Sequence, residues 1–282
     1  MRQTRQVLNS PRLSELKKQR QQKKMLRRSL ILILLLILCA ALVVLARNEK
    51  VNINSVKVMG NKVVDPEAVR GVAERELEGF YFWLLPKTNF LIYPQSSIER
   101  ALAAEFPRFK TVSIGIRKPQ TLEIQLLERE PRYTWCGAEP SANPLSCYFL
   151  DEEGYIFDQA PYFSGEVNFR FYGETATNPV NSYFLKDNFK ELINFKENLS
   201  AIGLEPVALY AYGTDREMFL SAVSQREKPK IIFKANEDYT RIAENLEAAL
   251  ATEPLATDVA KKYSSLQYID LRFVNKVYYK FR

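Results

Sequence analysis

The stretch that decides the fold is "VNINSVKVMGNKVVDPEAVRGVAERELEG" at residues 51–79, where one hydrophobic period gives way to another. Its first part alternates apolar and polar residues, as a half-buried strand does. The apolar positions are Val51, Ile53, Val56 and Val58. Gly60 and Asn61 follow them and predict that the strand ends there in a turn.

The second part of this stretch predicts an amphipathic helix. Asp65 suits the N-cap and Pro66 the first helical position, while Gly79 ends the pattern. A second helix is expected to begin at Ser96, and two strands at 111–118 and 121–130. The order strand, helix, helix, strand, strand predicts a compact sheet with helices on one face.

The charge of the chain is concentrated before this domain. Residues 1–28 contain ten Lys and Arg residues against the single Glu15, a balance of +9, so the rest of a chain with net charge +7 sums to −2. The basic character therefore belongs to a tail and not to a binding face, which argues against a nucleic-acid-binding domain.

An uncharged run, "SLILILLLILCAALVVLA", occupies Ser29–Ala46. As a helix its eighteen residues span about 27 Å, against about 30 Å of hydrocarbon in a bilayer. Buried helices of soluble proteins seldom stay apolar on every side for so long. The cations before the run predict a cytoplasmic tail at 1–28, an anchor at 29–46 and exported domains beyond it.

A cleaved signal peptide is the alternative, with Val44-Leu45-Ala46 as its cleavage site. The apolar run is longer than the usual signal and its basic region is unusually long, which favours an uncleaved anchor. Cys39 does not suit lipidation, because Leu38 stands where a small residue is needed. The tail is expected to lie against anionic lipid.

The C-terminal half predicts more strands and two helices. "FLDEEGYIF" at 149–157 is expected to form a hairpin with its turn at Glu153-Gly154. Helices are expected over 182–202 and from Tyr239 to Leu250, with strands between and after them. The segment 160–180 could not be assigned from its sequence.

These elements resemble a known family of bacterial cell-division proteins, the FtsQ/DivIB type. "VKVMGNKVVDPEAV" and "FPRFKTVSIGIRKPQTLEIQLLEREP" are similar to the two ends of its POTRA domain, and Glu128-Arg129-Glu130-Pro131 is similar to the usual "E-R-x-P" exit. "FLDEEGYIF" resembles the "L-D-x-x-G" hairpin of the family's second domain, and "YIDLRF" its C-terminal "V-D-L-R-Y" strand. The resemblance covers residues 25 to 282.

The resemblance implies an α+β chain: a single transmembrane helix, a POTRA-like β-α-α-β-β domain at 47–130, and a β-rich domain at 131–282 with helices packed on its sheet. It implies a single-pass protein of the cytoplasmic membrane at the division septum, with its C-terminal domains outside. The implied function is that of a non-enzymatic scaffold that recruits other division proteins and helps to control septal peptidoglycan synthesis.

Cys136 and Cys147 flank a loop containing Pro and Gly. A disulfide that closes this hairpin fits an exported domain and would contribute about 3 kcal/mol. Two buried free thiols are the alternative.

No residue pattern in the sequence indicates catalysis or a cofactor. The chain contains no histidine, which removes the usual catalytic pairs and most zinc sites. It also lacks phosphate-loop and dinucleotide motifs. Asp151, Glu152, Glu153 and Asp158 supply enough carboxylates for a glycan hydrolase, but acidic clusters beside a glycine turn are usually solvated hairpin tips.

The last residues, "YIDLRFVNKVYYKFR" at 268–282, predict two strands joined by the loop Val274-Asn275-Lys276. Equal parity of the facing residues would pair Phe273 with Val277, Leu271 with Tyr279 and Ile269 with Phe281 on the buried face, and Asp270 with Lys280 on the other. The last strand then has one side free for a partner strand.

In the family this region docks small bitopic coiled-coil proteins of the FtsB/DivIC and FtsL type. The resemblance therefore implies partner-binding residues here: Arg272, Phe273, Tyr278, Tyr279, Lys280, Phe281 and, less directly, Arg216. The alternative is an ordinary edge protected by the charges of Lys276, Lys280 and Arg282.

The aromatic stretch "FYFWLLPKTNFLIY" at 80–93 is expected to pack largely beneath the first helix, with contact to lipid headgroups or a partner as the alternative. Rival functions for the whole chain are a POTRA chaperone of the cell envelope and a membrane-anchored cell-wall enzyme.

Overall fold

The computed structural model describes residues 11–118, 120–141, 144, 146–161, 168–221, 228–273 and 276–282. The chain forms two compact units. The first unit comprises Met1–Ala103 and Val112–Leu126, and the second unit comprises Ala104–Thr111 and Leu127–Arg282. The domain limits expected from the sequence, at 28, 46 and 130, stay predictions.

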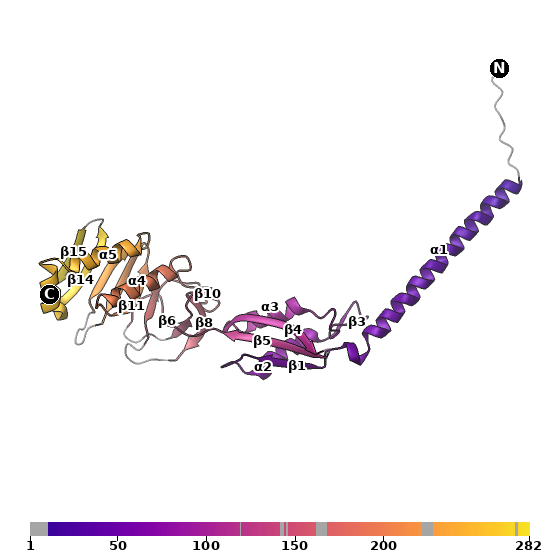
Figure 1. The fold of residues 1–282 in the computed structure, drawn as a ribbon, viewed down its shortest axis with the longest axis horizontal. Coiled ribbons are helices and arrows are strands. Elements are labelled where there is room, and N and C mark those ends of the chain that lie inside the picture. The colour runs from indigo at the N-terminus through magenta and orange to yellow at the C-terminus, as the bar shows by residue number, and fades with distance from the viewer. Residues whose placement is uncertain are drawn as a thin grey trace, which may run out of the picture. The chain divides into compact units, whose positions relative to one another are not determined.

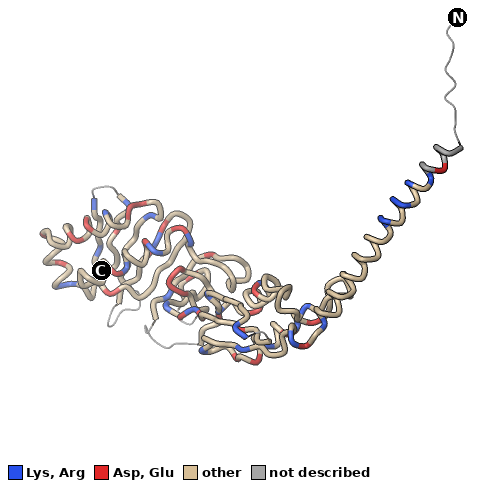
Figure 2. The backbone as a smooth tube through the Cα atoms, turned by 45° about the vertical axis from the view of Figure 1, so that its right-hand side comes forward, with Lys and Arg blue, Asp and Glu red and all other residues tan. Residues whose placement is uncertain are grey.

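The first unit begins with a long helix, α1, at Pro11–Ala46. Figure 2 shows its basic residues before Ser29, followed by a stretch without charge. In the described part of the chain, this is the one helix long and apolar enough to cross a membrane. The N-terminal apolar helix is thus a candidate single-pass anchor, with the rest of the unit beyond it.

After α1 the chain forms a small α+β fold (Figure 1). Its sheet has the order β1-β5-β4, with β1 parallel to β5. The elements are η1 (Glu49–Val51), β1 (Ser55–Met59), α2 (Pro66–Leu77), β2 (Phe80–Tyr81), β3 (Leu85–Pro86), α3 (Gln95–Glu105), β4 (Phe109–Lys118) and β5 (Thr121–Glu128).

The order strand, turn, helix expected for residues 51–79 is confirmed, but the strand begins only at Ser55, because Val51 belongs to η1. The Asp65 side chain accepts a hydrogen bond from Glu67 N at 3.1 Å, which caps α2. Four residues of α2, spaced so that they share one face of the helix, are buried: Val69, Val72, Ala73 and Leu77. Gly60 has φ of +86°, and a Cβ there would lie 2.1 Å from Leu126 O. Only glycine fits this turn.

The second unit is built on one ten-stranded sheet, with the order β10-β8-β7-β6-β9-β11-β12-β13-β14-β15. Its elements are β6 (Tyr133–Trp135), β7 (Cys147–Leu150), β8 (Tyr155–Ala160), β9 (Arg170–Gly173), β10 (Ser182–Tyr183), α4 (Phe189–Ala201), β11 (Pro206–Tyr212), β12 (Asp215–Leu220), β13 (Lys230–Lys234), α5 (Tyr239–Leu250), α6 (Leu255–Lys262), η2 (Tyr263–Ser265), β14 (Leu266–Phe273) and β15 (Lys276–Phe281).

Helices α4 and α5 pack on the sheet and form the main core with it (Figure 1). The ring of Phe195 on α4 lies 4.8 Å from that of Phe233 on β13 and 5.8 Å from that of Tyr239 on α5. The expected α+β architecture is therefore confirmed.

In this unit, one expected helix has different bounds and one helix was not expected. The helix expected over 182–202 begins only at Phe189, because Ser182–Tyr183 pairs with β8 and Leu185 has a positive φ of 50°. Helix α6 was not expected at all. The unassigned segment contains β9, while residues 162–167 lie outside the described residues.

The β7–β8 hairpin is fixed by a buried carboxylate. Asp151 Oδ1 accepts from Glu153 N at 2.9 Å and from Tyr155 N at 3.0 Å, and its Oδ2 accepts from the guanidinium of Arg129. The guanidinium of Arg129 also lies 4.0 Å from the centre of the Tyr155 ring. The "E-R-x-P" and "L-D-x-x-G" motifs therefore meet in one ion pair within the second unit.

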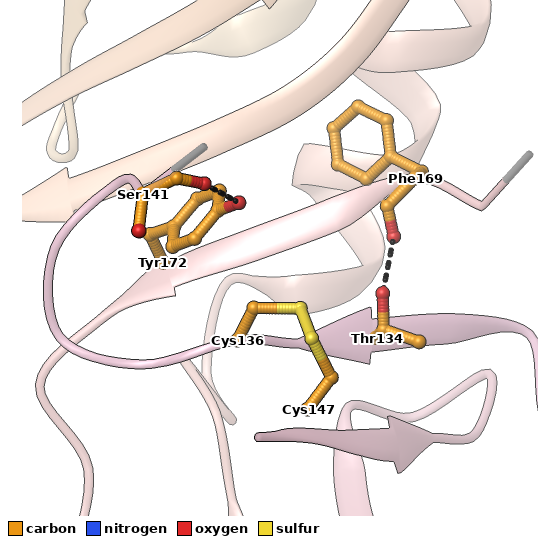
Figure 3. The surroundings of a disulfide bond; sticks show 6 residues. All are labelled: Thr134, Cys136, Ser141, Cys147, Phe169 and Tyr172. Atoms are coloured by element: carbon orange, nitrogen blue, oxygen red, sulfur yellow. Dashed lines mark hydrogen bonds between the residues drawn. A yellow bond between two sulfur atoms is a disulfide. The ribbon is translucent and has the colours of Figure 1, made fainter. Parts of the chain in front are cut away.

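Cys136 and Cys147 lie at the ends of β6 and β7 (Figure 3). Their sulfur atoms are 2.03 Å apart and form a disulfide in the structure. Figure 3 also shows Tyr172 Oη donating to Ser141 O, in the loop that the two cysteines enclose.

The turn at Gly154 yields a stability prediction. Gly154 has φ of +77°, and a Cβ there would lie 2.7 Å from the ring of Phe189. Gly203 has a similar φ of +84° with no atom within 4 Å of its Cβ position. We expect Gly154→Ala to lower the free energy of unfolding by about 3 kcal/mol or more and Gly203→Ala by about 1 kcal/mol. Urea unfolding followed by the fluorescence of buried Trp135 measures both, and equal losses would contradict the role of the close approach.

The disulfide yields a second prediction. Replacing Cys136 and Cys147 together by Ser should lower the free energy of unfolding of the second unit by about 3 kcal/mol, because the closed loop restricts the unfolded chain. Cys39→Ser is the control and should change nothing, since Cys39 is exposed on α1. Alkylation of Cys136 and Cys147 in protein that has not been reduced would show that the bond does not form.

Candidate functional site

The C-terminal strand β15 ends the ten-stranded sheet. It pairs with β14 on one side, and no strand within the described residues pairs with its other side. We call this other side the open edge. The opposite end of the sheet is β10, which has only two residues, whereas β15 has six.

The register between β14 and β15 differs from the expected one. The structure pairs Leu266 with Phe281, Tyr268 with Lys280, Ile269 with Tyr279, Asp270 with Tyr278, and Phe273 with Lys276. The register shifts between Leu266 and Tyr268 and again between Asp270 and Phe273. In both places β14 contributes one extra residue, so β14 bulges while β15 stays regular.

The expected pairs Phe273–Val277, Leu271–Tyr279, Ile269–Phe281 and Asp270–Lys280 are therefore wrong, and Lys276 belongs to β15 and not to the loop. Val274 and Asn275 lie outside the described residues. Phe273, which was expected on the buried face, is exposed, and its ring lies 5.1 Å from that of Tyr278.

The hydrogen bonds between β15 and β14 show which backbone groups of β15 face the open edge. Arg282 N donates to Ser265 O at 2.8 Å, on the side of β14. Because the bonding direction alternates along a regular antiparallel strand, the N–H and C=O groups of Val277, Tyr279 and Phe281 face the open edge.

The side chains of β15 form two rows with different surroundings. Val277, Tyr279 and Phe281 are half-buried and pack against the main core. Tyr278 and Lys280 are exposed on the other face, as is Lys276. The expectation of an apolar row against the core is therefore correct, even though its pairing was not.

A groove lies beside the half-buried row of β15. Its volume is about 530 Å³. Helices α5 and α6 form one side of it, and the β14–β15 hairpin forms the other. Ala249, Leu255, Leu271 and Val277 give it apolar walls, and Asn245 and Lys276 add polar groups. We call it the hairpin groove; the sequence did not reveal it, because part of one wall comes from residues 252–254 and from Leu255, the first residue of the unexpected helix α6.

Arg272 is held by two carboxylates. Its Nη2 lies 2.7 Å from Asp270 Oδ2, and its Nη1 lies 2.8 Å from Asp215 Oδ2 on β12. Burial alone would raise the pKa of Asp270, but the hydrogen bonds and the positive charge of Arg272 outweigh it, so that this pKa is lowered. Arg272 therefore braces β14 against β12 across β13.

Arg216 does not lie near the open edge. It is buried on β12, separated from β15 by two strands, and its Nη1 donates to Gly213 O at 3.2 Å and to Asp215 O at 2.7 Å. Burial lowers the pKa of its guanidinium. The structure thus brings together six of the seven expected residues on the β14–β15 hairpin, and places Arg216 apart from them on β12.

The acidic residues near the β7–β8 turn face cations. Glu152 lies 2.7 Å and Glu153 3.3 Å from Lys110 Nζ, and Asp158 lies 2.6 Å from Arg108 Nη2. The hydrogen bond from Lys110 lowers the pKa of Glu152. A glycosidase acid needs the opposite shift at neutral pH. Within the described residues, no cluster of three metal-ligating side chains occurs.

The brace around Arg272 yields a prediction on acid stability. The pKa of Asp270 is lower in the folded than in the unfolded protein. The ionised carboxylate therefore adds to the free energy of unfolding above the unfolded pKa of about 4, and this stabilisation is lost as the pH falls. We expect Asp270→Asn to cost about 1–3 kcal/mol at pH 7 and much less near pH 3. Asp258→Asn, which removes the exposed pair with Lys262, is the control. Urea unfolding across this pH range measures both, and a cost for Asp270→Asn that is independent of pH would contradict the brace.

Comparison with known families identifies the domain that follows α1. Residues 51–129 match the model of the POTRA domain, FtsQ-type. A search of curated proteins found no match to this chain. The FtsQ-type POTRA family is a non-enzymatic scaffold family, and the match starts directly after the candidate anchor α1. The chain therefore carries an FtsQ-type POTRA domain behind a long apolar helix, the arrangement of FtsQ/DivIB-type division proteins.

Proposed function

We propose that this protein is a non-enzymatic scaffold of the bacterial division machinery that binds partner proteins at the open edge of β15. The partners are small bitopic coiled-coil proteins of the FtsB/DivIC and FtsL type, and the scaffold helps to control septal peptidoglycan synthesis through them. The observation that carries the proposal is a six-residue edge strand whose outer backbone groups have no partner strand within the described residues.

The backbone of β15 favours strand addition. Main-chain groups of Val277, Tyr279 and Phe281 face outward at every second residue, which is the spacing that an added strand needs. Affinity would come from these groups and would depend little on sequence. Specificity would come from the side chains on either side of the added strand.

The side chains around β15 favour a partner strand with two different faces. On one face, the hairpin groove offers apolar walls beside the half-buried Val277 and Tyr279. On the other face, Lys280 and Tyr278 are exposed. An added strand that alternates apolar and acidic residues matches both faces. The alternative, an ordinary edge protected by charges, explains the exposed lysines of β15 but not the hairpin groove.

The proposed orientation in the membrane is inferred from the charges on either side of the uncharged run of α1. Lys and Arg residues before Ser29 favour the cytoplasm, so α1 would place both units on the outer side of the cytoplasmic membrane, with the basic tail against its anionic inner leaflet. The division septum is the proposed place of action.

Two rival functions have weaker support. An envelope chaperone of the POTRA type would use the same domain, but it does not explain the length of the open edge of β15. A cell-wall enzyme would need a carboxylate with a raised pKa, and the pKa of Glu152 is lowered. The proposal includes no cofactor and no nucleic acid.

Val277→Pro tests strand addition. It removes one outward N–H from β15 at a position where an edge strand tolerates proline, while Val277→Ala shortens the same side chain and keeps the N–H. The full chain is co-expressed with the host's FtsB/DivIC- and FtsL-type proteins, and the retained partner is measured after purification. We expect Val277→Pro to reduce retention at least tenfold, which corresponds to about 1.4 kcal/mol, and Val277→Ala to reduce it much less.

A photocrosslinking residue provides the positional control. At exposed Lys280 it should give an adduct with the partner, and at Glu244, exposed on α5, it should give none. Equal retention by the proline and alanine variants, with no adduct from Lys280, would rule out docking at this edge. A fluorescent fusion that stays diffuse in dividing cells would contradict the scaffold function itself.

A further inference from the structure

The aromatic stretch after α2 does not pack beneath a helix as expected. Its most exposed side chains are Trp83 at 91% and Phe82 at 88%, and Phe80, Leu84 and Leu91 are more than half exposed. All of these except Leu91 belong to the short hairpin of β2 and β3, in which Phe80 pairs with Pro86 and Tyr81 with Leu85. We call residues 80–86 the aromatic hairpin.

The tip of the aromatic hairpin is locally unfavourable. Leu84 N donates to Tyr81 O at 3.0 Å and closes a turn whose central residues, Phe82 and Trp83, have φ of 48° and 64°. Tight hairpin turns with two positive φ angles usually contain Asn and Gly, and bulky residues there cost of order 1 kcal/mol or more each. The turn thus presents two large aromatic rings to solvent in a conformation that such residues avoid.

The aromatic hairpin is tied to the end of α1. Arg47, the first residue after α1, donates from Nε to Leu84 O at 3.2 Å and from Nη2 to Trp83 O at 3.4 Å. Its guanidinium also lies 5.6 Å from the centre of the Phe80 ring. Both hydrogen bonds reach the tip itself, so the rings of the tip are held beside the last turn of α1.

A second set of contacts makes this junction rigid. Ala46 O, the last carbonyl of α1, accepts from Asn52 Nδ2 at 3.0 Å and from Asn89 Nδ2 at 3.2 Å. Thr88 Oγ1 donates to Asn52 Oδ1 at 2.9 Å. Asn52, shortly before β1, and Asn89, shortly after β3, therefore cap the C-terminal end of α1. The end of α1 and the aromatic hairpin form one body within the first unit.

We propose that the aromatic hairpin is a second membrane contact, with Phe82 and Trp83 inserted in the headgroup region of the outer leaflet. The uncharged run of α1 ends at Ala46, so Arg47 stands at the boundary of the hydrocarbon. Groups within hydrogen-bonding distance of Arg47 then lie in the interfacial layer, which is about 5–7 Å thick on each side of a bilayer. Trp and other aromatic residues are enriched there.

This contact sets the orientation of the POTRA domain. A single transmembrane helix leaves the domain free to rotate about the helix axis, whereas a second contact beside the helix end fixes one face toward the lipid. The inference rests on α1 being the membrane anchor, but it does not depend on partner docking at β15.

Fluorescence of Trp83 tests the contact. The full chain is reconstituted without other proteins in vesicles of phosphatidylethanolamine and phosphatidylglycerol that contain nitroxide-labelled lipid. The only other tryptophan, Trp135, is buried in the second unit, and the difference between the wild type and Trp83→Phe isolates Trp83. We expect blue-shifted emission and quenching roughly twofold stronger from a headgroup-proximal nitroxide than from one at the chain end.

Two matched variants in the Trp83→Phe background provide the controls. Val63→Trp moves the reporter to an exposed apolar position after the far end of β1, where we expect no quenching. Leu36→Trp places it in the middle of the uncharged run, where the chain-end nitroxide should quench most strongly.

The outcomes separate two proposals: that α1 is the membrane anchor, and that the aromatic hairpin contacts lipid. If Leu36→Trp is quenched and Trp83 stays water-exposed, the anchor stands and the second contact is overturned. If Trp83 becomes shielded only when the FtsB/DivIC- and FtsL-type proteins are added, the aromatic hairpin binds protein and the lipid contact is likewise overturned. If neither reporter is quenched, α1 is not inserted and both proposals fail.

Discussion

The constraint on which the second unit depends is that a sheet leaves backbone hydrogen-bonding groups at its two edges. Helices α4 and α5 supply the core on one face, but they do nothing for the edges. One edge is reduced to the two residues of β10, which is a common way to blunt an edge. The other edge, β15, is long, regular and flanked by half-buried apolar residues. A fold that limits one edge and leaves the other open favours an added strand on the side of β15.

Much of this architecture could be predicted from the sequence because it depends on local periodicity. The alternation at 51–59 and the cap at Asp65 fix the opening of the POTRA domain, and the apolar row of Val277, Tyr279 and Phe281 faces the core as expected. The register of the last hairpin could not be predicted, because β14 contains two bulges. One of them lies where Arg272 N donates to Asp270 Oδ1 and where Arg272 reaches Asp215, fifty-seven residues away. Parity rules cannot anticipate a contact that the tertiary fold supplies.

Two further misses concern which side chains are buried. Arg216 looks like a surface cation in the sequence, yet the β11–β12 turn offers it two carbonyl groups and buries it. The aromatic stretch looks like core material, because aromatic residues usually find a core. The rings of Phe82 and Trp83 are exposed because Arg47 and the capped end of α1 hold the hairpin tip away from the POTRA core. Arg216 binds carbonyl groups close to it in the chain, whereas Arg47 binds carbonyl groups more than thirty residues away. Composition and spacing reveal neither set of hydrogen bonds.

The open edge and the aromatic hairpin share one physical property. Each exposes to water groups that another molecule could cover: main-chain groups on β15 that could pair with an added strand, and two aromatic rings in a strained turn on the hairpin. Local features that contradict the general rules of folding persist where function needs them. According to the two proposals, the aromatic hairpin lies where the chain enters lipid, and β15 faces the compartment of the partner proteins. The proposed occupants differ, lipid for the aromatic hairpin and a polypeptide strand for β15, so that binding at one surface would leave the other free.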